Sequence, residues 1–342
     1  QEILNSKRRI TKVSDKSNSL KQPQGSLGKT IRNYKLELGM TVILIVLYIV
    51  LHAVTGTALG KGNVMNVLQS AAPLLIMTMG QLLVVITGGI DLSVGSVYSL
   101  SGMVGALVML STGSIAAGVA ACLAVGLVCG VLNGLLVAKA KMAPFIVTLA
   151  MQGAAASLTK VISGGNSQTI TLTAFKEFNR GTIVPGLKNY ILYMIIIVIV
   201  MYFVLRKTSF GRWVYATGSN EGASHLVGIP VDRVKILCYT ISAGLSSIAA
   251  LLGASRLMTV ECTAGVGMEL DAIAATCIGG ASLSGGLGSA FGALIGTLLQ
   301  KGINNGINLL GINSFWSGIV TGIVIVVAVY VGKIASRGRK RV

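Results

Sequence analysis

Few side chains in this 342-residue sequence are suited to acid–base, nucleophilic or metal chemistry. It contains two histidines and five cysteines, and the cysteines show none of the spacings that bind zinc. We interpret the cysteines as small apolar residues of the interior. Gly28-Lys29-Thr30 looks like the end of a phosphate-binding loop, but that motif needs a glycine at the position of Pro23. The sequence therefore predicts no catalytic residue, no metal site and no cofactor.

Asp91 stands out among the acidic residues because it lies between two long stretches without charge. A carboxylate at membrane depth is costly, so it normally faces protein or water and has a task. Gly88 and Gly89 precede it and Ser93 follows, a pattern that ends one helix and begins another. Three interpretations stay open: a helix cap, a gate residue that ties the broken helix to a neighbour, and a proton relay. A relay needs further acidic residues or histidines in the membrane, and we expect Asp91 to be alone there.

A second glycine-rich break, Gly279 to Gly288, repeats the pattern Gly-Gly-x-x-Leu-Ser of the first. Paired broken helices indicate the central pathway of a transporter, whereas glycines such as Gly292 and Gly296 also serve close helix packing, and both interpretations stay open. The candidate gate or pathway residues are Gly88, Gly89, Asp91, Ser93, Gly279, Gly280 and Ser282. The weakly polar residues that would line a passage for a neutral solute, or equally bond helices together, are Gln81, Ser96, Ser99, Ser101, Asn133 and Gln152.

The composition requires membrane helices to position these residues. Hydrophobic residues make up 53% and charged residues 11%, against about 25% charged in soluble domains. This excludes an ordinary soluble enzyme. The net charge of +18 is concentrated at the two ends of the chain, which indicates cytoplasmic ends next to anionic membrane lipid and excludes a nucleic-acid partner.

Stretches without Asp, Glu, Lys or Arg count the spans, since a helix needs about 20 apolar residues to cross a bilayer. They run 38–60, 62–90, 92–138, 142–159, 189–205, 236–255, 272–300 and 302–332. Dividing 92–138 at Ser111–Ser114 and 272–300 at its glycines yields ten spans. The predicted fold is an all-α polytopic membrane bundle of about ten helices, some broken by glycine, with both termini cytoplasmic. Residues 1–37 are expected to be a basic, disordered cytoplasmic tail, 38–333 the transmembrane domain, and 334–342 a second basic tail.

The loop 206–235 is cytoplasmic in this arrangement and contains a short helix. Ser219 or Asn220 is able to cap a helix over 221–227, and Gly228 would end it. An apolar edge flanked by arginines suits docking on a partner, although a solvated connector is the alternative.

Four stretches together resemble the permease subunits of bacterial ABC transporters that import monosaccharides of the ribose, xylose and galactoside type. They are residues 88–96, residues 133–137 with 144–149, the loop 208–235, and residues 279–288, and the resemblance covers about residues 40 to 333. It implies a multi-pass subunit of the bacterial cytoplasmic membrane that has no ATPase site of its own. The implied partners are a cytoplasmic ATP-binding subunit, an extracytoplasmic sugar-binding protein and a second permease copy or paralogue. Coupling to the ATPase would fall on Gly218, Asn220, Glu221, Ala223, Ser224, Gly228 and Ile229.

The alternative function is a gradient-driven secondary transporter of a small polar solute. Such a transporter normally has several carboxylates in the membrane, and we expect only Asp91. A membrane-embedded enzyme would need a nucleophile, a base or a metal cluster, and the sequence shows none.

Overall fold

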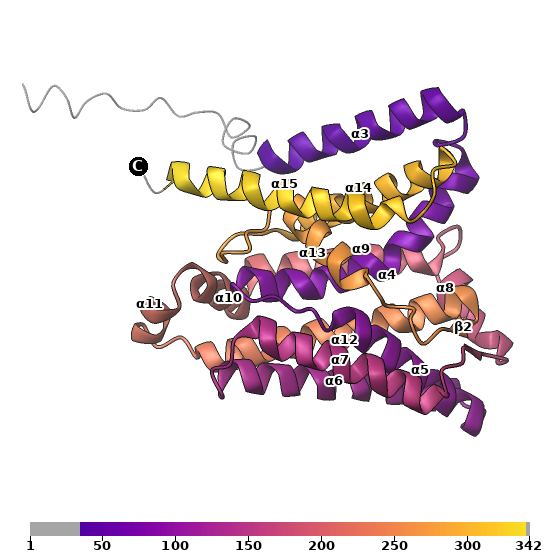
Figure 1. Ribbon diagram of the computed structural model, residues 1–342, viewed down its shortest axis with the longest axis horizontal. Helices are drawn as coiled ribbons and strands as arrows, with labels where there is room; N and C mark the ends of the chain where they lie inside the picture. The colour runs from indigo at the N-terminus through magenta and orange to yellow at the C-terminus, as the bar shows by residue number, and fades with distance from the viewer. Residues whose placement is uncertain (1–34, 340–342) are drawn as a thin grey trace, which may run out of the picture.

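The computed structural model describes residues 35–339, which form a bundle of helices with one pair of very short strands (Figure 1). Nearly all of the expected N-terminal tail and residues 340–342 lie outside the described residues. The longer helices are α3 (Lys35–Thr55), α4 (Lys61–Ile86), α5 (Val94–Thr112), α6 (Ile115–Ala138), α7 (Pro144–Ser163), α9 (Asn189–Lys207), α12 (Val231–Leu257), α14 (Ala290–Leu309) and α15 (Trp316–Arg339). The shorter elements are η1 (Thr173–Phe175), α8 (Lys176–Arg180), α10 (Ser209–Ser219), α11 (Glu221–Leu226) and α13 (Met268–Ile278), with β1 (Gln168–Thr169) antiparallel to β2 (Thr259–Val260).

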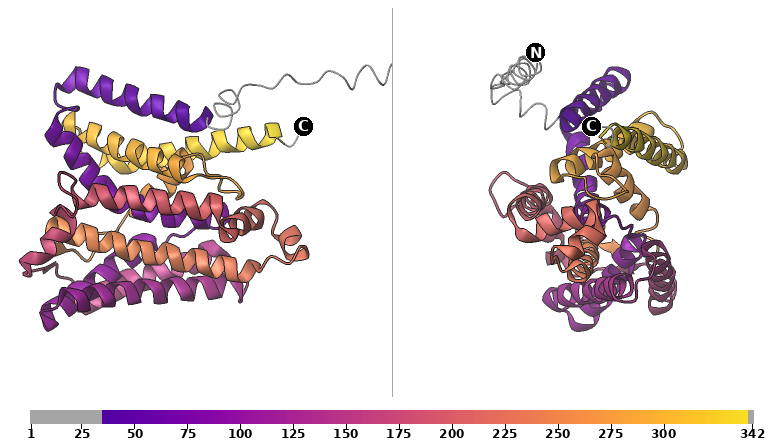
Figure 2. Two further views of the ribbon diagram at one scale, coloured as in Figure 1. Left: turned by 180° about the vertical axis from the view of Figure 1, so that it is seen from behind. Right: turned by 90° about the vertical axis from the view of Figure 1, so that its left-hand side faces the viewer.

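Helix α4 forms the centre of the bundle. Residues 71–87 are all buried, as expected for a helix that is apolar on every side. It packs against α12, α14, α13 and α9. By contrast, α3 lies at the margin of the bundle, where its apolar side chains are exposed (Figure 2). The core is therefore built around one central helix whose C-terminal end carries the first glycine break.

Seven of the described helices are long and apolar enough to cross a membrane: α3 to α7, α9 and α12. This confirms an all-α polytopic membrane protein, while the count of ten spans stays a prediction. Helix α13 has 11 residues. At 1.5 Å per residue it is about 16 Å long, roughly half of the apolar core of a bilayer, so it does not cross by itself.

The predicted boundaries near residue 300 are wrong. Helix α14 continues through Lys301 to Leu309, and α15 begins only at Trp316. Lys301 is tolerated inside the bundle because its Nζ lies 3.8 Å from the Asp271 carboxylate and both side chains are largely buried. Helix α13 also begins before the predicted window and carries Asp271 and a buried acid, Glu269. We expected Asp91 to be the only carboxylate in the membrane part of the bundle, and this expectation is therefore wrong.

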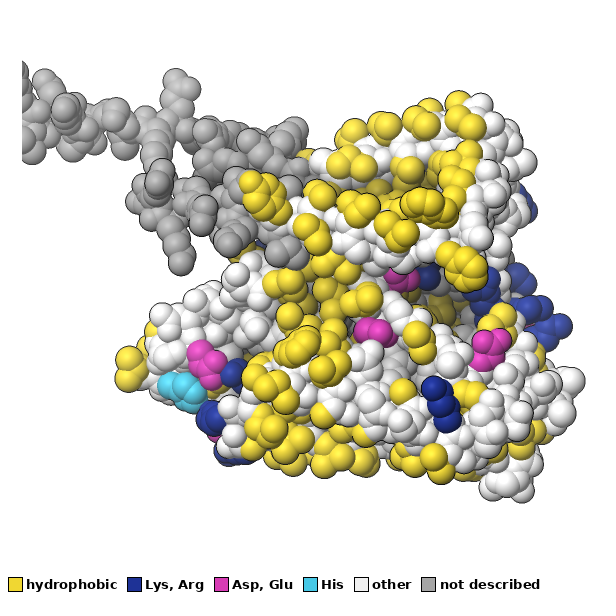
Figure 3. Space-filling model, viewed as in Figure 1, with side chains coloured by type: hydrophobic (Ala, Val, Ile, Leu, Met, Phe, Trp, Pro, Cys, Tyr) yellow, Lys and Arg dark blue, Asp and Glu magenta, His cyan; other side chains and the backbone are white. Residues whose placement is uncertain are grey.

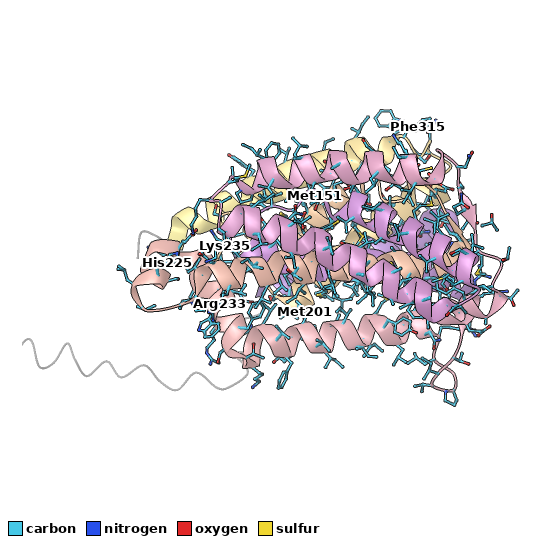
Figure 4. The ribbon with its side chains drawn as sticks, turned by 90° about the horizontal axis from the view of Figure 1, so that it is seen from below. Met151, Met201, His225, Arg233, Lys235 and Phe315 are labelled. Carbon is cyan, nitrogen blue, oxygen red and sulfur yellow. The ribbon has the colours of Figure 1, made fainter. Side chains whose placement is uncertain are left out.

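The described chain begins and ends at the same end of the bundle, and α11 projects from that end (Figure 1). His225, Arg233 and Lys235 lie there, whereas Phe315 lies at the opposite end (Figure 4). Apolar side chains cover much of the face drawn in Figure 3 between the two ends, and exposed apolar residues occur on α3, α6, α7, α9 and α15. The molecule thus has one end marked by α11, an apolar girdle and an opposite end.

Candidate functional site

The first glycine break is organised around the Asp91 carboxylate. Helix α4 ends at Ile86, Gly88 takes a left-handed conformation with φ +82°, and α5 begins only at Val94. Asp91 is fully buried, and its Oδ1 accepts from the Ser93 N–H (2.9 Å) and Oγ–H (2.6 Å). Its Oδ2 accepts from the Ser242 hydroxyl of α12 at 3.3 Å. Asp91 thus both orders the start of α5 and ties it to a neighbouring helix.

Polar side chains of further helices surround this break. Asn133 of α6 donates from Nδ2 to the Ser93 hydroxyl at 2.9 Å, and Thr148 of α7 donates to the Ile90 carbonyl at 3.3 Å. The side-chain amide of Gln81 is oriented so that its nitrogen donates to the Asp91 carbonyl (3.1 Å) and its oxygen accepts from the Asp91 N–H (3.3 Å). Gln81 and Asn133 therefore bond one segment of the bundle to another.

Glycines of the two breaks also allow close packing. A Cβ at Gly89 would lie 2.5 Å from the Tyr239 hydroxyl, and one at Gly279 would lie 2.5 Å from the carbonyl carbon of Gly292 in α14. Gly280 takes the left-handed conformation that turns the chain out of α13, with φ +84°. Ser282 is bonded locally, its hydroxyl accepting from the Ser284 N–H at 3.2 Å. Gly89 and Gly279 therefore have a packing role in this structure.

The end of α4, the end of α10 and the second break meet with no side chain between their backbones. The Gly286 N–H donates to the Ile86 carbonyl at 2.8 Å. A Cβ at Gly218 would overlap that carbonyl oxygen and lie 2.7 Å from the Gly286 nitrogen, and one at Gly285 would lie 2.6 Å from the Gly218 oxygen. We call Ile86, Gly218, Gly285 and Gly286 the glycine junction. It joins two of the sequence motifs, the loop 208–235 and residues 279–288, to the end of α4 just before the first break.

The expected cap of the short helix α11 is Asn220 rather than Ser219. Its Oδ1 accepts from the Ala223 N–H at 2.9 Å. Ser224 is buried and donates to the Asn220 carbonyl at 2.8 Å, while Glu221 pairs with Lys235 at 2.7 Å. Asn220, Glu221 and Ser224 thus hold the shape of the turn.

The end of α11 confirms the expected stop at glycine. Gly228 has φ +79°, and the Ile229 N–H donates to the Ser224 carbonyl at 3.0 Å. The side chains that α11 presents outward are Leu226, 90% exposed, and Val227, 75% exposed. Neither was among the predicted coupling residues, although two adjacent large apolar residues in the loop 206–235 were a usable signal.

Besides Leu226 and Val227, Glu269 is a functional candidate that the sequence did not reveal. It is 6% exposed, its Oε1 accepts from Gln152 Nε2 at 3.0 Å, and no hydrogen-bond donor reaches its Oε2 from any described residue. Within residues 35–339, no three His, Cys, Asp or Glu side chains gather as a metal site would require.

These features lie within a segment that matches a known family. Residues 63–329 match the family model described as "Branched-chain amino acid transport system / permease component". The chain belongs to this permease family. The permease is 45% identical over 306 residues to a probable ABC transporter permease protein of Sinorhizobium fredii, which covers 90% of this chain and 92% of the relative.

Two further relatives are named for the solute that they import. The ribose import permease protein of Bacillus subtilis is 40% identical, over 86% of this permease and 91% of the relative. That of Escherichia coli is 37% identical, over 86% and 93% respectively. No solved structure was found that matches the chain. The permease is therefore a multi-pass protein of the cytoplasmic membrane and the membrane component of an ABC importer.

Proposed function

We propose that this permease moves a neutral monosaccharide into the cell, powered by a separate ATPase subunit and supplied by an external sugar-binding protein. The observation that carries the proposal is its similarity, over most of its length, to permeases named for ribose import. The interior agrees with a neutral, hydroxyl-rich solute, because the break at Asp91 is lined by hydroxyl and amide groups. Such groups exchange hydrogen bonds with sugar hydroxyls without needing a charge on the solute.

The ATPase docks on α11 in this proposal. Leu226 and Val227 expose large apolar side chains at the end of the molecule, outside the apolar girdle. Burying them under a partner is favourable, at about 25 cal/mol per Å² of apolar surface. This end is then cytoplasmic, and both described chain ends lie on the same side as the ATPase (Figure 1).

The glycine junction connects the docking turn to the pathway. The permease forms no covalent bond with the solute and alternates between two packings separated by a few kcal/mol. When the ATPase moves α11, α10 moves with it, and the end of α10 contacts the backbone of both breaks. The permease works as a dimer with a second copy or a paralogue, surrounded by membrane lipid.

A branched-chain amino acid is the second candidate solute, because the family description names one. The test is uptake of labelled ribose and labelled leucine by permease reconstituted with its ATPase and binding protein. We expect ribose uptake that needs ATP and both partners. Leucine uptake instead of ribose would favour the second candidate, and uptake driven by an ion gradient with the permease alone would refute the ABC mechanism.

Replacing Leu226 with Asp tests the docking turn. The change puts a charge where an apolar side chain should be buried, so we expect the ATPase to bind at least about tenfold more weakly. The measurement is affinity of the ATPase for permease in nanodiscs. Val266→Asp is the matched control, since Val266 is 73% exposed in the segment before α13. Equal ATPase affinities for both variants would contradict docking on α11.

A further inference from the structure

Helices α5 and α13 both begin inside the bundle, and the segment just before α13 touches the first two turns of α5. The Ser99 hydroxyl of α5 accepts from the Gly265 N–H at 2.8 Å. A Cβ at Gly265 would overlap the Gly95 carbonyl oxygen, so the two backbones meet directly. The starts of two helices therefore lie side by side in one region of the bundle.

This region lies at an intermediate depth of the apolar girdle. Glu269, in the first turn of α13, is bonded to Gln152, which lies eight residues into the 20-residue helix α7. At 1.5 Å per residue, Gln152 is about 12 Å along a helix of about 30 Å. The Glu269–Gln152 pair is thus far from both ends of α7.

The carboxylate of Glu269 is incompletely satisfied. One oxygen has Gln152 as its side-chain partner, and the other has no hydrogen-bond partner although the residue is 94% buried (6% exposed). No Lys, Arg or His of the described chain lies within ion-pair distance of it. A buried carboxylate oxygen without a donor is costly, so such atoms normally bind a ligand or water. Asp91, by contrast, has donors on both oxygens.

In this packing the oxygen is covered by the backbone of α5. A Cβ at Gly95 would overlap Glu269 Oε2, so glycine at this position lets the carboxylate lie against the helix. On the other side of the Gly95–Gly265 contact, a cavity of about 140 Å³ is bordered by Tyr98, Gly102 and Ala264, the neighbour of Gly265. A cavity of roughly 150 Å³ admits a molecule the size of benzene. The cavity lies near the end of α12 that is remote from α11, since Leu257 also borders it.

We propose that Glu269 and Gln152 form a contact site for the hydroxyl groups of the transported monosaccharide. The inference rests on the proposed function and adds a location to it. When the permease changes packing and the contact of Gly95 with Gly265 opens, a sugar in the cavity reaches the carboxylate, and one of its hydroxyls donates to Oε2. The Gln152 amide, held by Glu269, offers its oxygen to a second hydroxyl. The site favours neutral polyols, because a carboxylate accepts several O–H donors and repels anions.

The test compares sugar uptake with ATP hydrolysis in the complete transporter. Permease, ATPase and binding protein are reconstituted in proteoliposomes, and labelled ribose is the probe. Glu269→Gln keeps the size of the side chain and removes its charge, so we expect ribose uptake to fall about tenfold while ATP hydrolysis stays within about twofold. Glu269→Asp restores the charge and should recover part of the uptake. Glu177→Gln, an exposed acid on α8, should leave both rates unchanged.

Gln152→Ala keeps the proposal testable should the Glu269 variants fold poorly. Gln152 is only partly buried, so its loss should lower ribose uptake several-fold while the thermal midpoint falls by only a few degrees, the cost of one hydrogen bond to Glu269. Unchanged uptake in Glu269→Gln would overturn the inference. So would a parallel loss of uptake, ATP hydrolysis and thermal stability, which would show that Glu269 serves only the N-terminus of α13. Absence of ribose uptake by the wild-type transporter would instead refute the proposed function.

Discussion

Two glycine contacts join broken helices in this permease, and they differ in the groups around them. At the α11 end, backbone groups of the glycine junction bond to each other: the Gly286 N–H donates to the Ile86 carbonyl, and beside the junction the Tyr215 hydroxyl donates to the Gly288 carbonyl at 2.7 Å. Deeper in the bundle, the contact of Gly95 with Gly265 lies beside Glu269, which keeps one oxygen without a partner.

The difference separates a mechanical role from a chemical one. Both contacts need glycine because backbone meets backbone in each of them. Backbone groups that bond directly to each other are suited to passing movement from one element to another. A carboxylate oxygen without a donor is the stronger acceptor, and it becomes available to a solute when the packing around it opens.

The largest effect is expected from Gly218→Ala. The new Cβ would overlap the Ile86 carbonyl, which is backbone and cannot turn away, so we expect a loss of about 3 kcal/mol in stability and the loss of ATP-driven uptake. Thermal unfolding in detergent and ribose uptake measure these. Gly222→Ala is the stability control, since its Cβ would have only the Asn220 Oδ1 nearby, at 3.6 Å. Equal thermal midpoints for Gly218→Ala and Gly222→Ala would contradict the close backbone contact at the glycine junction.

Gly95→Ala should have a smaller effect on stability. Its Cβ would displace the end of the Glu269 side chain, which can move, but would also press on the Gly265 carbonyl, so we expect a loss of about 2 kcal/mol. Ribose uptake should fall with it while ATPase binding is retained. Gly153→Ala, next to Gln152 on α7, meets nothing within 4 Å and should be neutral. A neutral Gly95→Ala would show that the two helix starts do not touch.

The smallest effect is expected from Tyr215→Phe. It removes a single hydrogen bond to the Gly288 carbonyl and should lower stability by about 1 kcal/mol. Thermal unfolding should shift by a few degrees, with the ATPase still bound. A loss of ATPase binding would mean that the hydroxyl does more than hold the second break against α10.

Local patterns predicted the local structure well. The two glycine breaks, the cap at Asn220 and the stop at Gly228 are confirmed because each depends on neighbours within a few residues. The same patterns predicted an apolar edge on this helix but did not single out Leu226 and Val227, since exposure of an apolar side chain on a short turn depends on what the rest of the fold covers.

The sequence by itself determined that this is a helical membrane protein, where its helices break, and which permease family it belongs to. The first two follow from apolar runs and glycine positions, which act on the backbone directly, and the third from the four stretches that resemble known permeases. Only the tertiary structure decided that Lys301 lies inside a helix beside Asp271, that Gly218 meets both breaks, and that Glu269 keeps a free oxygen. Pairing and desolvation of charges depend on residues far apart in the chain, so no local pattern contains them.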